Sequence, residues 1–192
     1  MAVTLRDIRE DDLENVMRWR MAPEITRYMN TDPVLTLEGQ KKWLASIQAN
    51  SDVKYWIIEI DGMPAGVVNI VGLDREDGKM TWAYYVGEKS LRSFKTALNL
   101  EMSMYEHVLV KLNRASVMSD VFSLNKGVIA LHEYCGCEVF QGKYDAVHGD
   151  EKFMYGIHTV MSFIAFEAGD YDFEDSFMDN MIECEERARN NE

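Results

Sequence analysis

The stretch from Leu91 to Cys137 does most to restrict what the 192-residue chain can fold into. Its apolar spacing predicts a long helix that begins near Arg92, followed by a strand from Arg114 to Ser119. A second helix then opens at Asn125 and closes at Gly136, since glycine readily takes the left-handed conformation that ends a helix. The stretch therefore predicts a helix–strand–helix unit.

The N-terminal part predicts one strand and then three helices. Residues Val3 to Arg9 alternate enough for a strand, and Asp11 with Glu14 three residues later forms the capping-box pattern of a helix start. Pro23 suits the first turn of a helix that runs through Tyr28. Thr36 is the expected cap of a third helix, which ends near Asn50.

After Ser51 the apolar pattern changes to a period of two, which is typical of strands. The sequence predicts an Asp61-Gly62 hairpin turn and five further strands, two of them near the C-terminal end: Tyr55 to Ile60, Ala65 to Val71, Met80 to Val86, Glu138 to Tyr144 and Lys152 to Val160. Written in order, the elements are βααα-βββ-α-β-α-ββ. This order predicts an α+β fold with a mixed, mostly antiparallel central sheet flanked by helices.

The C-terminal segment has a different composition. From Asp170 onward Phe173, Phe177 and Met181 stand near helical spacing among acidic residues, which predicts an amphipathic helical tail. Residues 1–160 are therefore expected to form the main domain, and residues 161–192 an acidic helical extension. Such a helix packs on its own domain or on a partner, including a second copy in a homodimer.

Charge and cysteine content narrow the class of protein. The net charge of −13 argues against nucleic acid as a partner, because phosphates are repelled. No run of about 18 apolar residues and no signal peptide is visible, so the protein is expected in the cytoplasm without membrane contact. Three cysteines without ligand partners at suitable spacing indicate reduced thiols and no metal site.

The helix at Asn125 carries a resemblance to a known family. Asn125, Val128, Leu131 and Gly136 resemble the Asn-x-x-(Ala/Val)-x-x-Leu-Tyr-x-x-x-Gly-Phe signature of GCN5-related (GNAT) N-acetyltransferases. His132 stands where the family has tyrosine, and Cys137 follows where it has phenylalanine. The resemblance covers about residues 3–160, and the predicted element order is also that of the GNAT fold.

The N-terminal helices resemble one bacterial branch of this family. The matching residues include Trp19-Arg20, Pro23-Glu24-Ile25 and Tyr28-Met29, and the branch holds ribosomal-protein alanine acetyltransferases and flagellin nonulosonate amino-sugar acetyltransferases. This resemblance implies transfer of an acetyl group from acetyl-CoA to a primary amine of a small molecule, preferably a nucleotide-linked amino sugar. The alternatives are a protein N-terminus, a polyamine, or a catalytically silent GNAT-like binding domain.

The resemblance also implies where acetyl-CoA binds. In the family the diphosphate lies at a helix start with the pattern (Gln/Arg)-x-x-Gly-x-(Gly/Ala), where free amides and the helix dipole favour anions. Here the pattern falls on residues 92–97, with Lys95 in place of glycine. The resemblance implies that the strand Met80 to Val86 splays from the strand Arg114 to Ser119 and leaves a wedge for the pantetheine arm. The implied cofactor-binding residues are Tyr85, Val86, Arg92, Ser93, Lys95, Thr96, Ala97 and Asn125.

The chemistry needs a neutral amine that attacks a thioester, together with a proton for the departing thiolate. The resemblance places His132 in the second role, and a half-exposed helical histidine without a catalytic role is the alternative. The general base is left open among Glu59, Asn69, Asp120 and a water relay. Asn125 is also expected to cap its helix, and buried thiols are expected at Cys135 and Cys137.

The acceptor amine is expected between the first two helices and the sheet. The residues implied to face it are Trp19, Arg20, Glu24, Tyr28 and Met29, with core packing or surface solvation as the alternative for each. An anionic sugar nucleotide would use Arg20 or Arg27, whereas a polyamine would use acidic residues instead.

Overall fold

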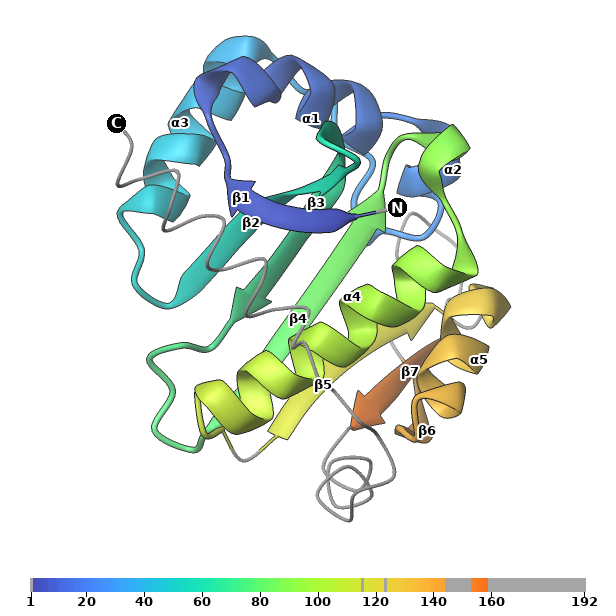
Figure 1. The fold of residues 1–192 in the computed structure, drawn as a ribbon. Coiled ribbons are helices and arrows are strands. Elements are labelled where there is room, and N and C mark those ends of the chain that lie inside the picture. Colours follow the sequence, from blue (N-terminus) through green and yellow to red (C-terminus); the bar gives the residue numbers. More distant parts are fainter. Residues whose placement is uncertain (1, 115, 123, 144–152, 159–192) are drawn as a thin grey trace.

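The computed structural model describes residues 2–114, 116–122, 124–143 and 153–158 (Figure 1). The elements are β1 (Val3–Asp7), a 3-10 turn (Glu10–Asp12), α1 (Leu13–Arg20), α2 (Pro23–Thr26), α3 (Leu37–Gln48), β2 (Val53–Ile60), β3 (Met63–Val71), β4 (Lys79–Val86), a 3-10 turn (Lys89–Leu91), α4 (Phe94–Glu106), a π-helical turn (His107–Lys111), β5 (Ser116–Phe122), α5 (Lys126–Tyr134), β6 (Glu138–Lys143) and β7 (Phe153–His158). The predicted α+β element order is confirmed, and the predicted acidic helix from Asp170 lies outside the described residues. Among the described helices, none combines the length and apolar character that crossing a membrane requires.

The described strands form one mixed sheet in the order β1-β2-β3-β4-β5-β7-β6. All neighbouring strands are antiparallel except β4 and β5, which run parallel. The predicted Asp61-Gly62 turn joins β2 to β3, with φ of 50° at Asp61 and 78° at Gly62. Positive φ at both central residues defines the tight turn that matches the strand twist, which is why an Asp-Gly pair stands there.

Each face of the sheet has its own core, because alternate residues of a strand point to opposite faces. Trp56 and Ile58 of β2 pack with α4, β5 and α5 in the larger core, whereas Ile57 packs with α1 and α3 in the smaller one. Figure 1 shows α4 lying across β4 and β5, with α1 and α3 on the other side of the molecule. The sheet therefore separates an α4–α5 side from an α1–α3 side.

The start of α1 differs from the prediction. Asp12, rather than Asp11, is the cap residue, and its side chain is buried. The carboxylate accepts two bonds of 2.7 Å from the guanidinium of Arg6 and one of 2.8 Å from the backbone N–H of Arg9. The prediction was wrong because a contact with Arg6 of the preceding strand β1, and not the local capping pattern, decides which of three successive acidic residues turns inward.

Two boundaries in the central stretch also move. α4 begins at Phe94, two residues later than predicted, because the Ser93 hydroxyl accepts from the N–H of Thr96 at 3.1 Å and so caps the helix. β5 begins at Ser116 and continues to Phe122, where it pairs with β7. Pairing with a strand far along the chain extends β5 beyond its local pattern.

Candidate active site

The parallel strands β4 and β5 separate partway along their length. Their ladder ends at Thr81 opposite Met118, although both strands continue. Just beyond this branch point the Ser119 hydroxyl donates to the carbonyl of Trp82 at 3.2 Å. Carbonyls of alternate residues in a strand point the same way, so Val86 also directs its carbonyl into the gap. The predicted splay of the two strands is confirmed.

Arg92 connects the end of β4 to the start of α4. Its Nε donates to the carbonyl of Val86 at 2.7 Å, and Nη2 donates to the carbonyl of Gly87 at 3.1 Å. These bonds hold an exposed guanidinium at the open end of the gap. A cation is therefore fixed beside the helix start.

The first turn of α4 brings together the residues expected to hold the diphosphate. Thr96 is fully buried and hydrogen-bonded to the Ser93 hydroxyl at 2.8 Å, whereas Lys95 is exposed and Ala97 is half-buried. The first amides of a helix have no intrahelical partner, and the helix dipole is positive there. This end of α4, with Arg92 and Lys95, is able to bind an anion.

Tyr85 and Asn125 lie apart from this helix start. The Tyr85 side chain lines a cavity on the α1–α3 side of the sheet. Asn125 is the N-cap residue of α5, but its side chain makes no capping bond, so that part of the prediction was wrong. Its φ of −86° and ψ of 60° depart from the extended conformation of a capping side chain, and its carbonyl accepts from Val128 and Ile129 at 3.1 Å.

His132 projects from α5 into the larger core, with 1% of its surface exposed. Nδ1 lies 2.8 Å from Oε2 of Glu101 and 2.8 Å from the hydroxyl of Tyr105. The imidazole meets Trp82 edge-on, with ring centroids 6.2 Å apart. The alternative of a half-exposed histidine is therefore wrong, because the side chain is buried. The contact with Trp82 places the imidazole beside the branch point.

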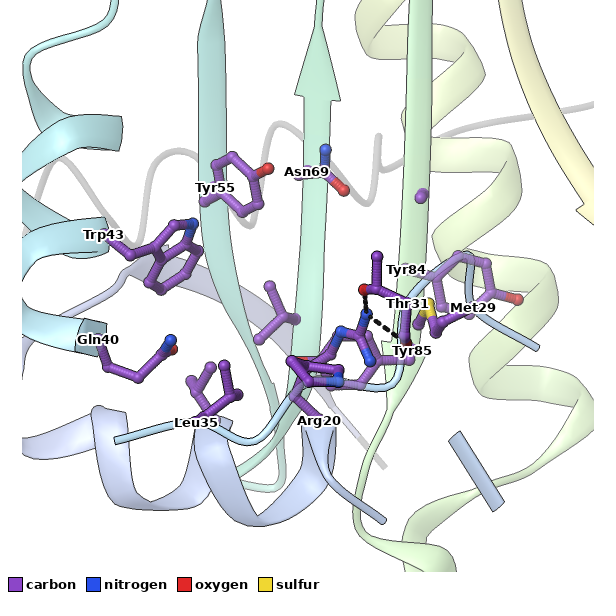
Figure 2. Close-up of a pocket in the computed structure, with 14 residues that line it drawn as sticks. Arg20, Met29, Thr31, Leu35, Gln40, Trp43, Tyr55, Asn69, Tyr84 and Tyr85 are labelled. Atoms are coloured by element: carbon purple, nitrogen blue, oxygen red, sulfur yellow. Dashed lines mark hydrogen bonds between the residues drawn. The ribbon is translucent and has the colours of Figure 1, made fainter. Parts of the chain in front are cut away.

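Two adjoining cavities lie on the α1–α3 side of the sheet. The larger, of about 390 Å³, is called the sheet-face cavity (Figure 2); its lining includes Val16, Arg20, Met29, Thr31, Gln40, Trp43, Tyr55, Asn69, Ala83 and Tyr85. The smaller, of about 240 Å³, is called the branch-point cavity and includes Trp82, Asp120 and Phe122 from the two separating strands. Met29, Asn69 and Ala83 line both cavities, so the hollow runs from α1 to the gap between β4 and β5.

The predicted acceptor-facing residues divide between these cavities and the core. Arg20 lines the sheet-face cavity, Tyr28 lines the branch-point cavity and Met29 lines both. The prediction that Trp19 faces the acceptor was wrong, because its side chain is 1% exposed and packs in the smaller core. Glu24 is exposed on α2 and lines neither cavity, so its contact with the acceptor stays a prediction.

The sequence did not indicate Trp43 and Tyr55 as site residues, and it assigned Tyr85 to the cofactor, although all three line the sheet-face cavity. Tyr55 of β2 and Tyr85 of β4 face the cavity, and Trp43 of α3 meets Tyr55 edge-on with centroids 5.4 Å apart. A signal was present, because strand residues at alternate positions share a face. Tyr55 and Tyr85 lie on the face of the sheet that α1 and α3 cover. The alternation of residues along β2 and β4 was sufficient to predict this.

Arg20 sets the electrostatics of the sheet-face cavity. Its Nη2 donates to the hydroxyl of Thr31 at 2.6 Å and to the Thr31 carbonyl at 3.1 Å, as Figure 2 shows. Its Nη1 is buried and has no hydrogen-bond partner among the described residues. Burial raises the pKa of Tyr85 and also that of Tyr55, so both phenols stay neutral. The cavity thus offers a guanidinium N–H next to neutral hydroxyl groups.

The three side chains considered as general base occupy different surroundings. Glu59 of β2 is paired with Arg6, whose Nε lies 2.7 Å from Oε1 of the carboxylate, and lines neither cavity. Asn69 lines both cavities, and Asp120 lines the branch-point cavity. Only Asn69 and Asp120 therefore remain close to the gap.

The cysteines of the central stretch are buried, as predicted. Cys135 and Cys137 are both thiols outside any disulfide of the described residues, with less than a tenth of their surface exposed. Burial, then the nearby charge of Glu101, raises the pKa of the Cys135 thiol. A protonated thiol is a poor nucleophile, so the geometry does not support a covalent cysteine mechanism.

The fold and the family match together define a class of protein, an α+β acyltransferase. The family model described as "Acetyltransferase (GNAT) domain" matches residues 2–138, and the chain belongs to this family. The protein is therefore an acetyl-CoA-dependent N-acetyltransferase of the GNAT type.

Solved structures share the fold at low sequence identity. A Vibrio cholerae spermidine N-acetyltransferase in complex with CoA and spermine is 14% identical, with a TM-score of 0.70, over 81% of this chain and 94% of that one. The aminoglycoside acetyltransferase AAC(6')-Ib in complex with coenzyme A is 21% identical, with a TM-score of 0.68, over 86% of this chain and 99% of that one. No curated protein sequence matches the chain.

Proposed function

We propose that the protein acetylates a primary amine of a small molecule that binds in the sheet-face cavity. The observation that carries this proposal is the continuity of the hollow, because Met29, Asn69 and Ala83 line both the sheet-face cavity and the branch-point cavity. An acceptor held by α1 and β2 then presents its amine at the gap between β4 and β5. The amine and the thioester react there in a ternary complex, without an acetylated enzyme.

Acetyl-CoA is expected to lie along the gap, with its diphosphate at the start of α4. Ser93, Lys95 and the amides of the first helical turn supply donors there, and Arg92 supplies a fixed cation. The amide groups of the pantetheine arm pair with backbone groups of β4 such as those of Val86, as an added strand does. The side chain of Asn125 makes no capping hydrogen bond to α5, so it can contact the cofactor.

The acceptor enters as an ammonium, and its nitrogen loses two protons while the sulfur gains one. The first proton leaves before the attack and passes to water held by Asn69 and Asp120 in the branch-point cavity. The nitrogen lone pair then forms a bond to the carbonyl carbon, the nitrogen gives its second proton to the same water, the C–S bond breaks and the sulfur keeps the electron pair. His132 donates a proton to that sulfur. The imidazole suits this task because it lies beside Trp82 at the branch point.

The preferred acceptor carries an anionic group, as a nucleotide-linked amino sugar does. Arg20 offers a buried guanidinium N–H without a partner among the described residues, and a phosphate oxygen satisfies it. The sheet-face cavity is lined by no carboxylate within the described residues. A polyamine is the second candidate, favoured by the net charge of −13 and by Asp120 in the branch-point cavity.

A panel of amines tests the proposal. The full chain is incubated with acetyl-CoA and either a nucleotide-linked 4-amino-4,6-dideoxy sugar, spermidine, or a peptide with a free N-terminal alanine. Release of CoA is followed with a thiol-reactive dye, and the product mass is checked for one added acetyl group. We expect the sugar nucleotide to give the highest kcat/KM. Preference for spermidine or the peptide would overturn the acceptor assignment, and no turnover with any amine would contradict the proposed activity.

A further inference from the structure

Glu101 is a fully buried carboxylate on α4 that has no role in the reaction described above. Its Oε2 accepts from the hydroxyl of Tyr105 and lies 2.8 Å from Nδ1 of His132. Its Oε1 has no hydrogen-bond partner among the described residues. Removing an ionised carboxylate from water costs several kcal/mol unless an opposite charge lies close to it. An ionised Glu101 therefore needs a cation beside it.

The hydrogen bonds around Glu101 all direct a proton toward it. The Cys137 thiol donates to the Tyr105 hydroxyl at 3.3 Å, and that hydroxyl donates to Glu101. An ionised carboxylate accepts only, so the contact with His132 is a hydrogen bond when Nδ1 carries the proton. The network thus fixes Nδ1 of His132 as a donor.

The neighbouring groups do not supply the positive charge. Burial, then the charge of Glu101, raises the pKa of Tyr84 and of Tyr105 well above the usual phenol value. Burial likewise raises the pKa of the Cys135 thiol. These groups from β4, α4 and the end of α5 therefore remain protonated and uncharged. His132 is the group in contact with Glu101 that is able to become a cation.

We propose that Glu101 is a positioning residue that holds His132 as an imidazolium, with Nδ1–H on the carboxylate and Nε2–H free to act as the proton donor. This rests on the proposed function, in which His132 protonates the departing sulfur. When the C–S bond breaks, the Nε2 proton passes to the sulfur and leaves a neutral imidazole next to Glu101. The imidazole recovers its proton from solvent before the next turnover, so the enzyme is unchanged.

The pair also accounts for the residue at position 132. The family signature resembled by Asn125 to Cys137 has a tyrosine here, and a phenol carries its proton at neutral pH without assistance. An imidazole at the same position carries two protons only when its surroundings favour the charged form. Glu101 provides those surroundings from α4, next to α5 in the larger core.

Imidazole NMR tests the proposal without an acceptor substrate. The full chain is labelled with ¹⁵N in its four histidine rings, His132 is assigned with a His132→Gln variant, and the ring nitrogens are titrated in wild type and Glu101→Gln. We expect both nitrogens of His132 to carry protons near neutral pH in wild type. In Glu101→Gln the midpoint of the charge loss falls by about one pH unit or more, because the opposite charge is gone while the shape is kept.

Tyr105→Phe is the matched variant, since it keeps the charge of Glu101 and removes only the neutral hydroxyl that contacts both the carboxylate and Nδ1 of His132. The midpoint of the His132 titration in Tyr105→Phe is expected to stay close to that of wild type. A wild-type ring that is neutral near pH 7 would overturn the proposal, as would a midpoint that Glu101→Gln leaves unmoved.

With an acceptor from the amine panel, Glu101→Gln should lower kcat about 10-fold or more, shift the alkaline fall of kcat to lower pH, and leave the KM for acetyl-CoA little changed. A panel without turnover would contradict the proposed function and leave the NMR result standing.

Discussion

The Cα atom of Gly87 lies against the indole of Trp19, so close that a Cβ on Gly87 would come within 2.1 Å of the Trp19 ring. The next residue, Glu88, accepts from Trp19 Nε1 at 2.8 Å. Gly87 also presents its carbonyl to Arg92. Residues 87 and 88 therefore join α1 to the end of β4 and to the start of α4. This junction explains why Trp19 is buried rather than facing an acceptor.

Gly87→Ala should destabilise the protein by about 2 to 3 kcal/mol, because a methyl group overpacks the buried indole. Urea denaturation followed by circular dichroism measures the change. Gly127→Ala is the control, since a Cβ at Gly127 of α5 meets nothing within 4 Å. That variant should be neutral or more stable by up to about 0.5 kcal/mol, as alanine favours helix more than glycine does. Equal effects at the two positions would contradict the close contact.

Glu88→Gln should destabilise the protein in a pH-dependent way. The hydrogen bond from Arg18, then that from Trp19, lowers the pKa of Glu88 in the folded state. The stabilisation is therefore complete above the ordinary carboxyl range and is lost as the pH falls through the lowered value. We expect wild type to exceed Glu88→Gln by about 1 kcal/mol at pH 7, since the pair is partly solvent-screened. The difference should shrink below pH ~4, and a constant difference in urea titrations from pH 7 to 3 would refute the ionic contribution.

Much of the fold followed from local sequence patterns. The Asp61-Gly62 turn and the apolar alternation of β2 to β4 specify hairpins whatever surrounds them. The helix predicted from Asn125 to Gly136 runs from Lys126 to Tyr134, and Gly136 just after it has the positive φ of 80° that marks a helix end. Where a contact between two elements decides, the prediction failed: Asp12 rather than Asp11 turns inward because Arg6 of β1 binds it.

Less of the site than of the fold could be predicted from the sequence. The family pattern marked Arg20, Tyr28 and Met29, which line the two cavities, and it also marked Trp19, which packs in the core. Glu101 gave no signal, since an acidic residue in a helix is ordinarily on the solvated face. Its role depends on His132, which reaches it only when α4 and α5 pack on one face of the sheet.

Arg20→Gln tests which charge the acceptor carries. Loss of the buried guanidinium should raise the KM for an acceptor with an anionic group about 10- to 100-fold, in line with the loss of a hydrogen bond to a charged group. The kcat should change less, because Arg20 lies in the sheet-face cavity away from the branch point. Steady-state kinetics with the best amine of the panel measures both parameters.

Arg75→Gln is the matched control for Arg20→Gln. It removes the same charge from an exposed loop, where Arg75 pairs with Asp77, and lines neither cavity. Its KM should equal that of wild type. An acceptor whose KM is unaffected, or lowered, by Arg20→Gln would exclude the anionic class and favour a polyamine.

Saturating acetyl-CoA should raise the melting temperature of the full chain by roughly 5 to 10 °C. Ligand at 100 times its Kd adds about 2.7 kcal/mol, and a chain of this length gains a few degrees per kcal/mol. Lys95 stands where the family pattern has glycine, and its exposed ammonium at the start of α4 is suited to a phosphate. Lys95→Ala should therefore weaken binding about 10-fold and remove about 1.4 kcal/mol of the gain at the same ligand concentration.

Lys42→Ala, on the exposed face of α3 and paired with Glu38, removes the same charge far from α4 and should leave the rise intact. Differential scanning calorimetry of the three proteins separates the two ways in which a lysine can replace a glycine at a phosphate site. A smaller rise in Lys95→Ala alone means that the ammonium substitutes for the close backbone approach that glycine allows. An equal rise in all three proteins means that the helix amides and Arg92 suffice. No rise in wild type would contradict the acetyl-CoA site at the start of α4.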